Sequence, residues 1–306
     1  MSDNNRTHEA SSLRAFFDHQ MQFVHELMTG LGHEGDEVEP LTGEDTRIIE
    51  SFVDAANSRI RAVHDYAHQL REHVRGLYSH ILQIAEEIPA VLDLNQEAFT
   101  LNPLVNALFV NSDDLEKLLK TSPDMRDFLQ EHSPNQMPVI YALLTACRDE
   151  KSVLGIGMMG DMLVRDVPQK SVNFSSHTLH VPCTNKSEMA QACKKFLFDR
   201  AVLLIKQDMS ARVVAEVTQT TDKSYEARLK SLNNPNVYLS TLIENLASPA
   251  RILSIATSHY KLNKLGIKLA DDDNQLANEF DIHEITWGDN SRNVVLQIAY
   301  PLQSRH

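Results

Sequence analysis

Two amphipathic helices are predicted for the first third of the chain. Between residues 10 and 29, apolar side chains recur at steps of three and four, which places them on one face of a helix. Two glycines end this segment, and the second helix is predicted to begin near Thr42 and to continue without a break to Ile88. Thr42 and Asp45 have the spacing of an N-terminal capping pair.

The second predicted helix carries a continuous heptad pattern. Isoleucine, valine or alanine occupies the first position of each repeat, and leucine, isoleucine or valine occupies the fourth. β-Branched residues at the first position with leucine at the fourth are typical of parallel two-stranded coiled coils. The positions of this seam, which are the predicted oligomerisation residues, are Ile60, Val63, Ala67, Leu70, Val74, Leu77, Ile81, Ile84 and Ile88.

The lengths of the two helices decide what can cover the seam. At about 1.5 Å per residue the first helix is about 30 Å long and the second about 65 Å. The first helix, folded back on the second, would cover mainly the part before Ile60. A second copy of the chain, with a dimer as the first choice, would bury the heptads. The helices after Pro89 would do the same within an intramolecular bundle, because bundle cores use the same spacing.

Shorter elements follow, and their period changes near Met137 from that of helices to that of strands. Because the runs predicted as strands are joined by short polar turns, they favour antiparallel hairpins. The expected helices cover residues 95–110 with a break at Pro103, 111–120, 123–131, 185–217, 222–232 and 237–246. The expected strands cover residues 139–147, 152–158, 162–167, 172–181, 251–262, 266–269, 277–287 and 293–300.

These patterns predict an α+β fold with two domains. Residues 1–135 form a helical bundle or coiled-coil region that contains the long heptad-patterned helix. Residues 136–306 form an α+β domain with a mainly antiparallel sheet packed with helices.

Charge and composition narrow the classes of partner. The chain has 306 residues, with 29 Lys and Arg against 42 Asp and Glu, a formal net charge of −13. That charge makes nucleic acid an unlikely partner and argues against anionic lipid, since clustered positive charge supplies most of the affinity for both. No apolar run approaches the roughly 20 residues of a membrane-spanning helix. With three cysteines, no CxxC and no visible secretory signal, a cytoplasmic protein with reduced thiols is expected.

A glycine motif in the middle of the chain invites a dinucleotide-binding interpretation. Residues 155–160 read Gly-Ile-Gly-Met-Met-Gly, which matches G-x-G-x-x-G. In a dinucleotide fold the motif follows a strand and opens a helix. Only seven residues separate Gly160 from Pro168, and residues 162–164 read as strand, so the pattern favours a glycine-containing hairpin.

The histidines raise the possibility of a metal site. His64, His68 and Glu72 would share one helical face, but they fall on the flank of the heptad seam. His177, His180 and Cys183 have side chains that zinc accepts. On a strand His177 and His180 point to opposite faces, and only a loop would bring them together. Catalytic residues and cofactors stay unassigned, and no G-x-S-x-G elbow is present.

Two stretches of the chain resemble a family of bacterial proteins of unassigned function. The first runs from Gly160 to Gln169, Gly-Asp-Met-Leu-Val-Arg-Asp-Val-Pro-Gln, and is followed by Val-Asn-Phe-Ser-Ser-His at 172–177. The second is Leu-Asn-Lys-Leu-Gly-Ile-Lys-Leu at 262–269. The resemblance implies a bacterial, cytosolic setting and supplies no activity, cofactor or catalytic residue.

The sequence therefore predicts a non-catalytic regulatory or scaffolding protein. It would self-associate through its N-terminal coil and bind a protein or small-molecule partner with its C-terminal domain. The alternative is a metal-dependent enzyme or sensor that uses the segment 161–183.

Overall fold

The structure is a computed structural model that describes residues 41–95, 97–109, 112–132, 138–159, 162–218, 233–270, 273, 275–288 and 291–302. The predicted helices over 10–29 and 222–232 lie outside these residues. In chain order the elements are α2 (Gly43–Ala56), the 3-10 helix η1 (Ser58–Ala62), α3 (Tyr66–Glu87), β1 (Leu92–Asp93), α4 (Ala98–Leu101), α5 (Pro103–Leu108), α6 (Ser112–Thr121), α7 (Pro123–Glu131), β2 (Val139–Met159), β3 (Met162–Cys183), α8 (Lys186–Thr218), α10 (Pro235–Leu246), α11 (Pro249–Ile252), β4 (Leu253–Leu262), β5 (Asn278–Trp287) and β6 (Ser291–Pro301).

The chain divides into two compact units. Unit 1 comprises Met1–Leu77 and Val202–Ala247, and unit 2 comprises Tyr78–Ala201 and Ser248–His306. The helices α3 and α8 contribute residues to both units. The units divide the chain differently from the predicted boundary after residue 135, which remains a prediction.

In the described part of unit 1, the helix α2 begins at the predicted capping pair. The backbone N–H of Asp45 donates to Thr42 Oγ1 at 3.0 Å, and the N–H of Thr42 donates to Asp45 Oδ2 at 3.2 Å, which forms a capping box at the start of α2. The buried Asp45 also accepts two hydrogen bonds of 3.2 Å from Arg75 on α3. Although burial opposes ionisation, the hydrogen bonds and charge of Arg75 lower the pKa of Asp45.

The single long helix expected up to Ile88 is wrong, because the chain turns between α2 and α3. Asn57 is extended, with φ −169°, and its Oδ1 accepts the backbone N–H of Arg59 at 3.0 Å. Asp65 has a left-handed φ of 59°. Asparagine and aspartate compete for local backbone hydrogen bonds and tolerate such conformations, so they end helices that apolar spacing alone would continue.

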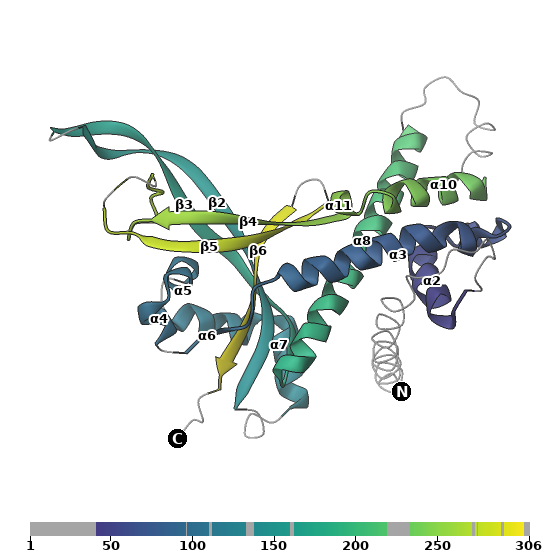
Figure 1. The fold of residues 1–306 in the computed structure, drawn as a ribbon, viewed down its shortest axis with the longest axis horizontal. Helices are drawn as coiled ribbons and strands as arrows, with labels where there is room; N and C mark the ends of the chain where they lie inside the picture. Colours follow the sequence, from purple (N-terminus) through teal and green to yellow (C-terminus); the bar gives the residue numbers. More distant parts are fainter. Residues whose placement is uncertain are drawn as a thin grey trace, which may run out of the picture. The chain divides into compact units, whose positions relative to one another are not determined.

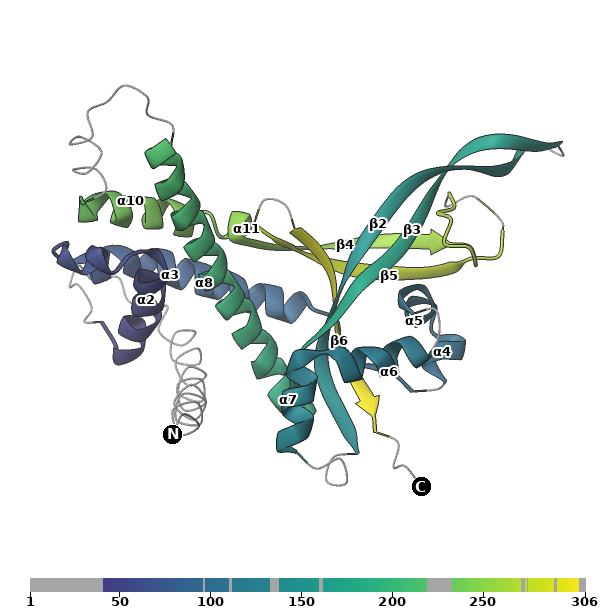
Figure 2. The ribbon, with the colours of Figure 1, turned by 180° about the vertical axis from the view of Figure 1, so that it is seen from behind.

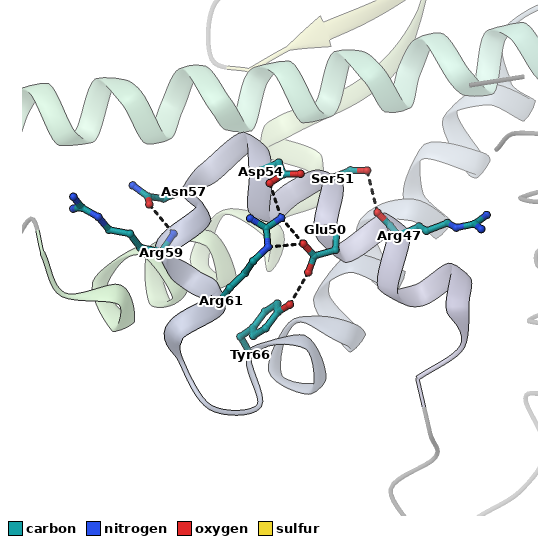
Figure 3. Close-up of polar contacts among 8 residues, drawn as sticks. All are labelled: Arg47, Glu50, Ser51, Asp54, Asn57, Arg59, Arg61 and Tyr66. Carbon is teal, nitrogen blue, oxygen red and sulfur yellow. Dashed lines mark hydrogen bonds and ion pairs between the residues drawn. The ribbon is translucent and has the colours of Figure 1, made fainter. Parts of the chain in front are cut away.

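Polar side chains join the residues on either side of this turn (Figure 3). Arg61 of η1 forms ion pairs with Glu50 and Asp54 of α2, and its Nε donates to Glu50 at 2.7 Å. The Tyr66 hydroxyl donates to the other Glu50 oxygen at 2.6 Å. These hydrogen bonds to Asp54 and Glu50 raise the pKa of Arg61. The network is largely exposed, so its main effect is to fix the geometry of the turn.

Unit 2 is built on an antiparallel sheet, as predicted. The strand order is β3-β2-β6-β5-β4, and the short β1 pairs with β6 in parallel. On one face, side chains of α5, α6 and α7 form a buried core with alternate residues of β2, among them Ala142, Leu144 and Ala146. The helices α5, α6 and α7, which precede the predicted boundary after residue 135, therefore pack on a strand that follows this boundary.

Two long strands replace the four short strands expected between residues 139 and 181. Each residue from Gly155 back to Cys147 pairs with β3, so the polar run 148–151 continues β2. Pro168 lies within β3, which is an edge strand of the sheet and tolerates the missing N–H. Residues 148–151 and Pro168 resemble turn residues in the sequence, but pairing between β2 and β3 holds them in strands. A local sequence pattern does not show such partners.

Candidate interaction surface

The predicted metal ligands His177 and His180 lie on opposite faces of the sheet. The His177 ring stacks on Phe109, which belongs to the core beneath α5, α6 and α7, with 4.9 Å between ring centroids. The His180 ring packs against Phe196 of α8 at 4.7 Å, and its Nε2 lies 3.0 Å from Thr145 Oγ1. Both rings are therefore parts of the packing, and the structure does not bring them together.

Cys183, the third predicted ligand, is a buried thiol. Its Sγ lies 3.7 Å from Met189 Sδ, and burial raises the pKa of Cys183 to about 12. Burial also raises the pKa of Cys193 to about 12. A thiol must lose its proton to bind a metal or attack a substrate, so both side chains behave as small apolar groups at neutral pH. Within the described ranges, no three or more His, Cys, Asp or Glu side chains are grouped so that they could hold a metal ion.

The burial of His177 gives the stability of the protein a pH dependence. Desolvation lowers the pKa of His177, although Leu108 and Asp114 oppose the shift, so the folded state favours the neutral ring. Because the folded pKa is below the ordinary value near 6.5, the stability contributed by the neutral ring is complete above that value and is lost as the pH falls through the folded pKa.

We expect His177→Phe to flatten the fall in unfolding free energy between pH 7.5 and pH 5. The flattening amounts to about 1.4 kcal/mol for each pH unit by which the folded pKa of His177 lies below its ordinary value. Urea denaturation at several pH values measures it. His64→Phe is the matched control, since the His64 side chain is 97% exposed, and its slope should equal that of the parent protein. Equal slopes for both variants would contradict the assignment of His177 as a buried neutral ring.

The heptad seam is mostly buried within the single chain. Seven of its nine positions are buried, and only Val63 and Ala67 are half-buried. Two members, Ile60 and Val63, precede α3, so the seam does not lie on one continuous helix. This burial favours the intramolecular alternative over a coiled coil between two copies, and a role of these residues in oligomerisation remains a prediction.

Residues 155–159, the part of the glycine motif that the structure describes, lie in β2, and the next described residues begin the strand β3, as the hairpin interpretation predicts. A Cβ on Gly155 would lie 2.0 Å from Gln169 Oε1, and one on Gly157 would lie 3.1 Å from a Val167 methyl group. The Gln169 amide crosses the ribbon and donates from Nε2 to the Ile156 carbonyl oxygen at 3.0 Å. The glycines therefore make room for side chains of β3 that fold across β2.

Beyond its pairing with β6, β2 continues with β3 alone as a two-stranded ribbon. The β2–β6 pairs end at Ala146, whereas the β2–β3 pairs continue to Met159 and Met162. Figures 1 and 2 show the paired ends of β2 and β3 extending past the other strands of unit 2. We call residues 152–159 and 162–170 the arm.

Large apolar side chains are exposed along the arm. Leu154 is 70% exposed, Ile156 62%, Met162 72% and Leu163 73%. Because side chains alternate along a strand and paired residues share a face, Leu154, Ile156 and Leu163 lie on one face of the ribbon. Met162, next to Leu163, lies on the other face. A cluster of exposed apolar side chains on one element is typical of an interaction surface.

The base of the arm is fixed by a buried ion pair. Arg148 of β2 donates from Nε to Glu284 Oε1 at 2.9 Å and from a terminal nitrogen to Oε2 at 3.1 Å. Glu284 of β5 is buried, and Arg148 also pairs with Glu150. The Tyr260 hydroxyl of β4 donates to Glu150 at 2.8 Å. Burial and this hydrogen bond raise the pKa of Tyr260 to about 12, so the phenol stays protonated.

A loop after β4 supports the arm from the edge of β3. The N–H of Val172 donates to the Gly266 carbonyl oxygen, and the N–H of Lys268 donates to that of Lys170, both at 2.8 Å. Gly266 has φ +73°, and a Cβ there would lie 2.9 Å from the Val172 oxygen, so the position requires glycine. The two stretches that carry the sequence resemblance therefore meet at the base of the arm.

Comparison of the chain with protein-family models, curated proteins and solved structures found no match. Among the helices of the described ranges, none is both long and apolar enough to cross a bilayer. The fold class is therefore shown by the structure alone, and the family resemblance stays an expectation from the sequence.

Proposed function

We propose that this chain is a non-catalytic regulatory or scaffolding protein that binds a macromolecular partner with its arm. The observation that carries the proposal is the exposure of Leu154, Ile156, Met162 and Leu163 on a ribbon that extends past the rest of its sheet. Exposing such side chains to water costs stability, and a partner that covers them recovers the cost.

The base of the arm supports this role. A surface that is held in place before binding loses less conformational freedom when the partner arrives. The Arg148–Glu284 pair and the hydrogen bond from Tyr260 to Glu150 tie β2 to β5 and β4. The arm therefore extends from a part of the sheet that these contacts hold in place.

The placement of the other candidate residues favours binding by the arm over the earlier alternatives. His177, His180 and Cys183 are parts of the packing of unit 2 on different faces of the sheet. Because the seam side chains are already largely buried within the single chain, we assign partner binding to the arm and not to a coiled coil.

Site-specific photo-crosslinking tests the proposal. A photoreactive amino acid replaces Leu163 in the full chain, and the control replaces Lys186, an exposed residue at the start of α8. On irradiation of cells that produce the protein, we expect a covalent adduct at position 163 and none at position 186. Adducts of equal yield at both positions, or none at 163, would refute binding by the arm.

A further inference from the structure

The strand β4 has an outer edge that is separate from the arm. β4 is the last strand in the sheet order β3-β2-β6-β5-β4, so β5 pairs with one of its edges and the other edge faces outward (Figure 1). The pairing with β5 continues without a register shift from Leu253 to Leu262. A strand at the edge of a sheet presents backbone N–H and C=O groups with which another strand can pair.

Two hydrogen bonds identify the residues of β4 whose backbone groups face outward. The carbonyl oxygen of Leu253 accepts from Nε2 of His80 on α3 at 2.7 Å, and that of Lys261 accepts from the N–H of Leu269 at 2.8 Å. Along an antiparallel strand, successive residues direct their backbone groups to opposite edges. The odd-numbered residues between Leu253 and Lys261 therefore also face outward.

The backbone groups of Ile255, Thr257 and His259 have no hydrogen-bond partner among the described residues. We call residues 255–259 the open edge. It is about 17 Å long and offers three N–H and three C=O groups at the spacing of a β-strand. Ala256, Thr257 and His259 are exposed, so this edge is in contact with water.

The two edges of the sheet differ in how they are protected. The strand β3 at the other edge contains Pro168, and its residues Lys170 and Val172 form hydrogen bonds with the loop after β4. The open edge contains no proline, no lysine and no register shift, which are common devices that keep an edge strand from pairing. Its sequence is Ile-Ala-Thr-Ser-His, and isoleucine and threonine favour strands. Nothing in the open edge itself therefore opposes pairing with a further strand.

We propose that the open edge binds an extended segment of a partner protein, which adds a strand beside β4. This site is separate from the arm and does not depend on the proposed function. The backbone of the segment would pair with the N–H and C=O groups of Ile255, Thr257 and His259. Another extended backbone has the same alternation of donors and acceptors, whereas a single small ligand lacks this repeat.

The length of the open edge argues against a second copy of β4 as the occupant. β4 has ten residues, which is twice the length of the open edge. In any register, a copy of this straight strand would overlap His80 beside Leu253 or the backbone of Leu269 beside Lys261. A segment of about five residues, a common length for a strand, fits between these two positions.

The charges beside the open edge favour a segment without acidic side chains. Asp281 and Glu279 of β5 lie opposite His259 and Lys261, and the side chains of both acids are more than half exposed. The whole chain has a net charge of −13. An acidic segment would be repelled by this charge, whereas a neutral or basic segment would not.

Peptide selection on the full chain tests this inference. The probe is a library of linear random peptides of seven residues, selected on the parent chain and counter-selected on Thr257→Pro. Proline at position 257 removes an outward N–H and leaves the N–H groups that face β5 in place. Thr257→Val is the matched control, because it keeps the outward N–H and the branched side chain.

We expect the selected peptides to bind Thr257→Val as they bind the parent chain, and Thr257→Pro at least about tenfold more weakly. They should also bind Leu163→Ser as they bind the parent chain, because the arm is not their site. Urea denaturation of Thr257→Pro shows whether this variant is folded.

Hydrogen exchange of the parent chain gives a readout that needs no variant. With a selected peptide bound, the amide protons of residues 255, 257 and 259 should exchange at least about tenfold more slowly, because each gains a hydrogen bond. The amide protons of residues 254, 256 and 258 face β5 and should change little. This alternation decides the question even if Thr257→Pro does not fold.

Four results would overturn the inference. They are the survival of no peptide, equal weakening by Thr257→Val and Thr257→Pro, slower exchange elsewhere but not at the open edge, and loss of binding to Leu163→Ser. Crosslinking at position 163 is measured separately, so failure of the open edge leaves binding by the arm standing, and failure of the arm leaves the open edge standing.

Discussion

Replacing Arg148 with methionine is expected to lower the free energy of unfolding by about 3–5 kcal/mol. The substitution leaves the Glu284 carboxylate buried without the guanidinium that donates two hydrogen bonds to it. A buried carboxylate that loses its partner costs much more than the pair contributes when intact. Urea denaturation monitored by circular dichroism measures the change.

A double-mutant cycle separates the pair from the packing of its side chains. We expect Arg148→Met with Glu284→Met to be more stable than Arg148→Met alone, because the second substitution removes the unpaired charge. Losses that simply add, or a loss below about 1 kcal/mol for Arg148→Met, would show that the ion pair does not hold the base of the arm.

Two adjacent substitutions on α3 are expected to change stability in opposite directions. Leu77 is fully buried, and Leu77→Ala should cost about 2–5 kcal/mol through lost burial and a cavity. Gly76 is exposed, and no atom lies within 4 Å of a Cβ added there. Gly76→Ala should therefore raise the unfolding free energy by about 0.5–1 kcal/mol, since alanine favours helices.

The Leu77→Ala variant, compared with the parent chain, also distinguishes a bundle within one chain from a coil between two chains. If the seam is covered within one chain, the unfolding midpoint of Leu77→Ala does not depend on protein concentration. A midpoint that rises with concentration in the parent chain, and less in Leu77→Ala, would restore these residues as the oligomer interface.

Most helices of this fold are predictable from local sequence patterns, because the residues that start, stop and orient a helix lie close to one another in the sequence. The structure confirms α8, α10 and the break at Pro103 between α4 and α5, and Thr42 with Asp45 forms the expected capping box. Capping residues, prolines and apolar spacing act within a few residues of each other, so no tertiary partner is needed to read them.

Two features of the chain differ from the local pattern, one because of distant contacts and one because of local backbone geometry. Residues 148–151 look like a turn, yet Arg148 and Glu150 are held in β2 by partners on β5 and β4 that lie more than 100 residues away. The apolar spacing continues through Ile60 and so predicts an unbroken helix, yet Ile60 is buried in η1. The local conformations of Asn57 and Asp65 turn the chain on either side of it.

The candidate surface could be predicted only in part. The sequence predicted a hairpin with glycines over 155–160, and the alternation of a strand predicted that His177 and His180 point apart, which their ring contacts confirm. Exposure of Leu154, Ile156 and Leu163 was not predicted, because an apolar strand in a sequence is normally read as buried. The absence of charge between Ser152 and Gly160 was the available signal, and it does not say whether anything covers the strands.

Thiol protection at the end of the arm tests binding by the arm most directly. The variants are Leu163→Cys and, as control, Ser187→Cys at an exposed position of α8, both with the half-buried Cys147 replaced by serine. Cys183 and Cys193 should not react with the maleimide, because burial raises their pKa values to about 12. In the purified protein, a membrane-permeable maleimide should label both introduced cysteines at similar rates.

In intact cells that produce the chain, we expect labelling at position 163 to slow several-fold relative to position 187. That result would mean that a partner, whether lipid or protein, covers the end of the arm. Labelling at 163 as fast as at 187 would mean that the arm stays in water inside the cell and would contradict the proposed function.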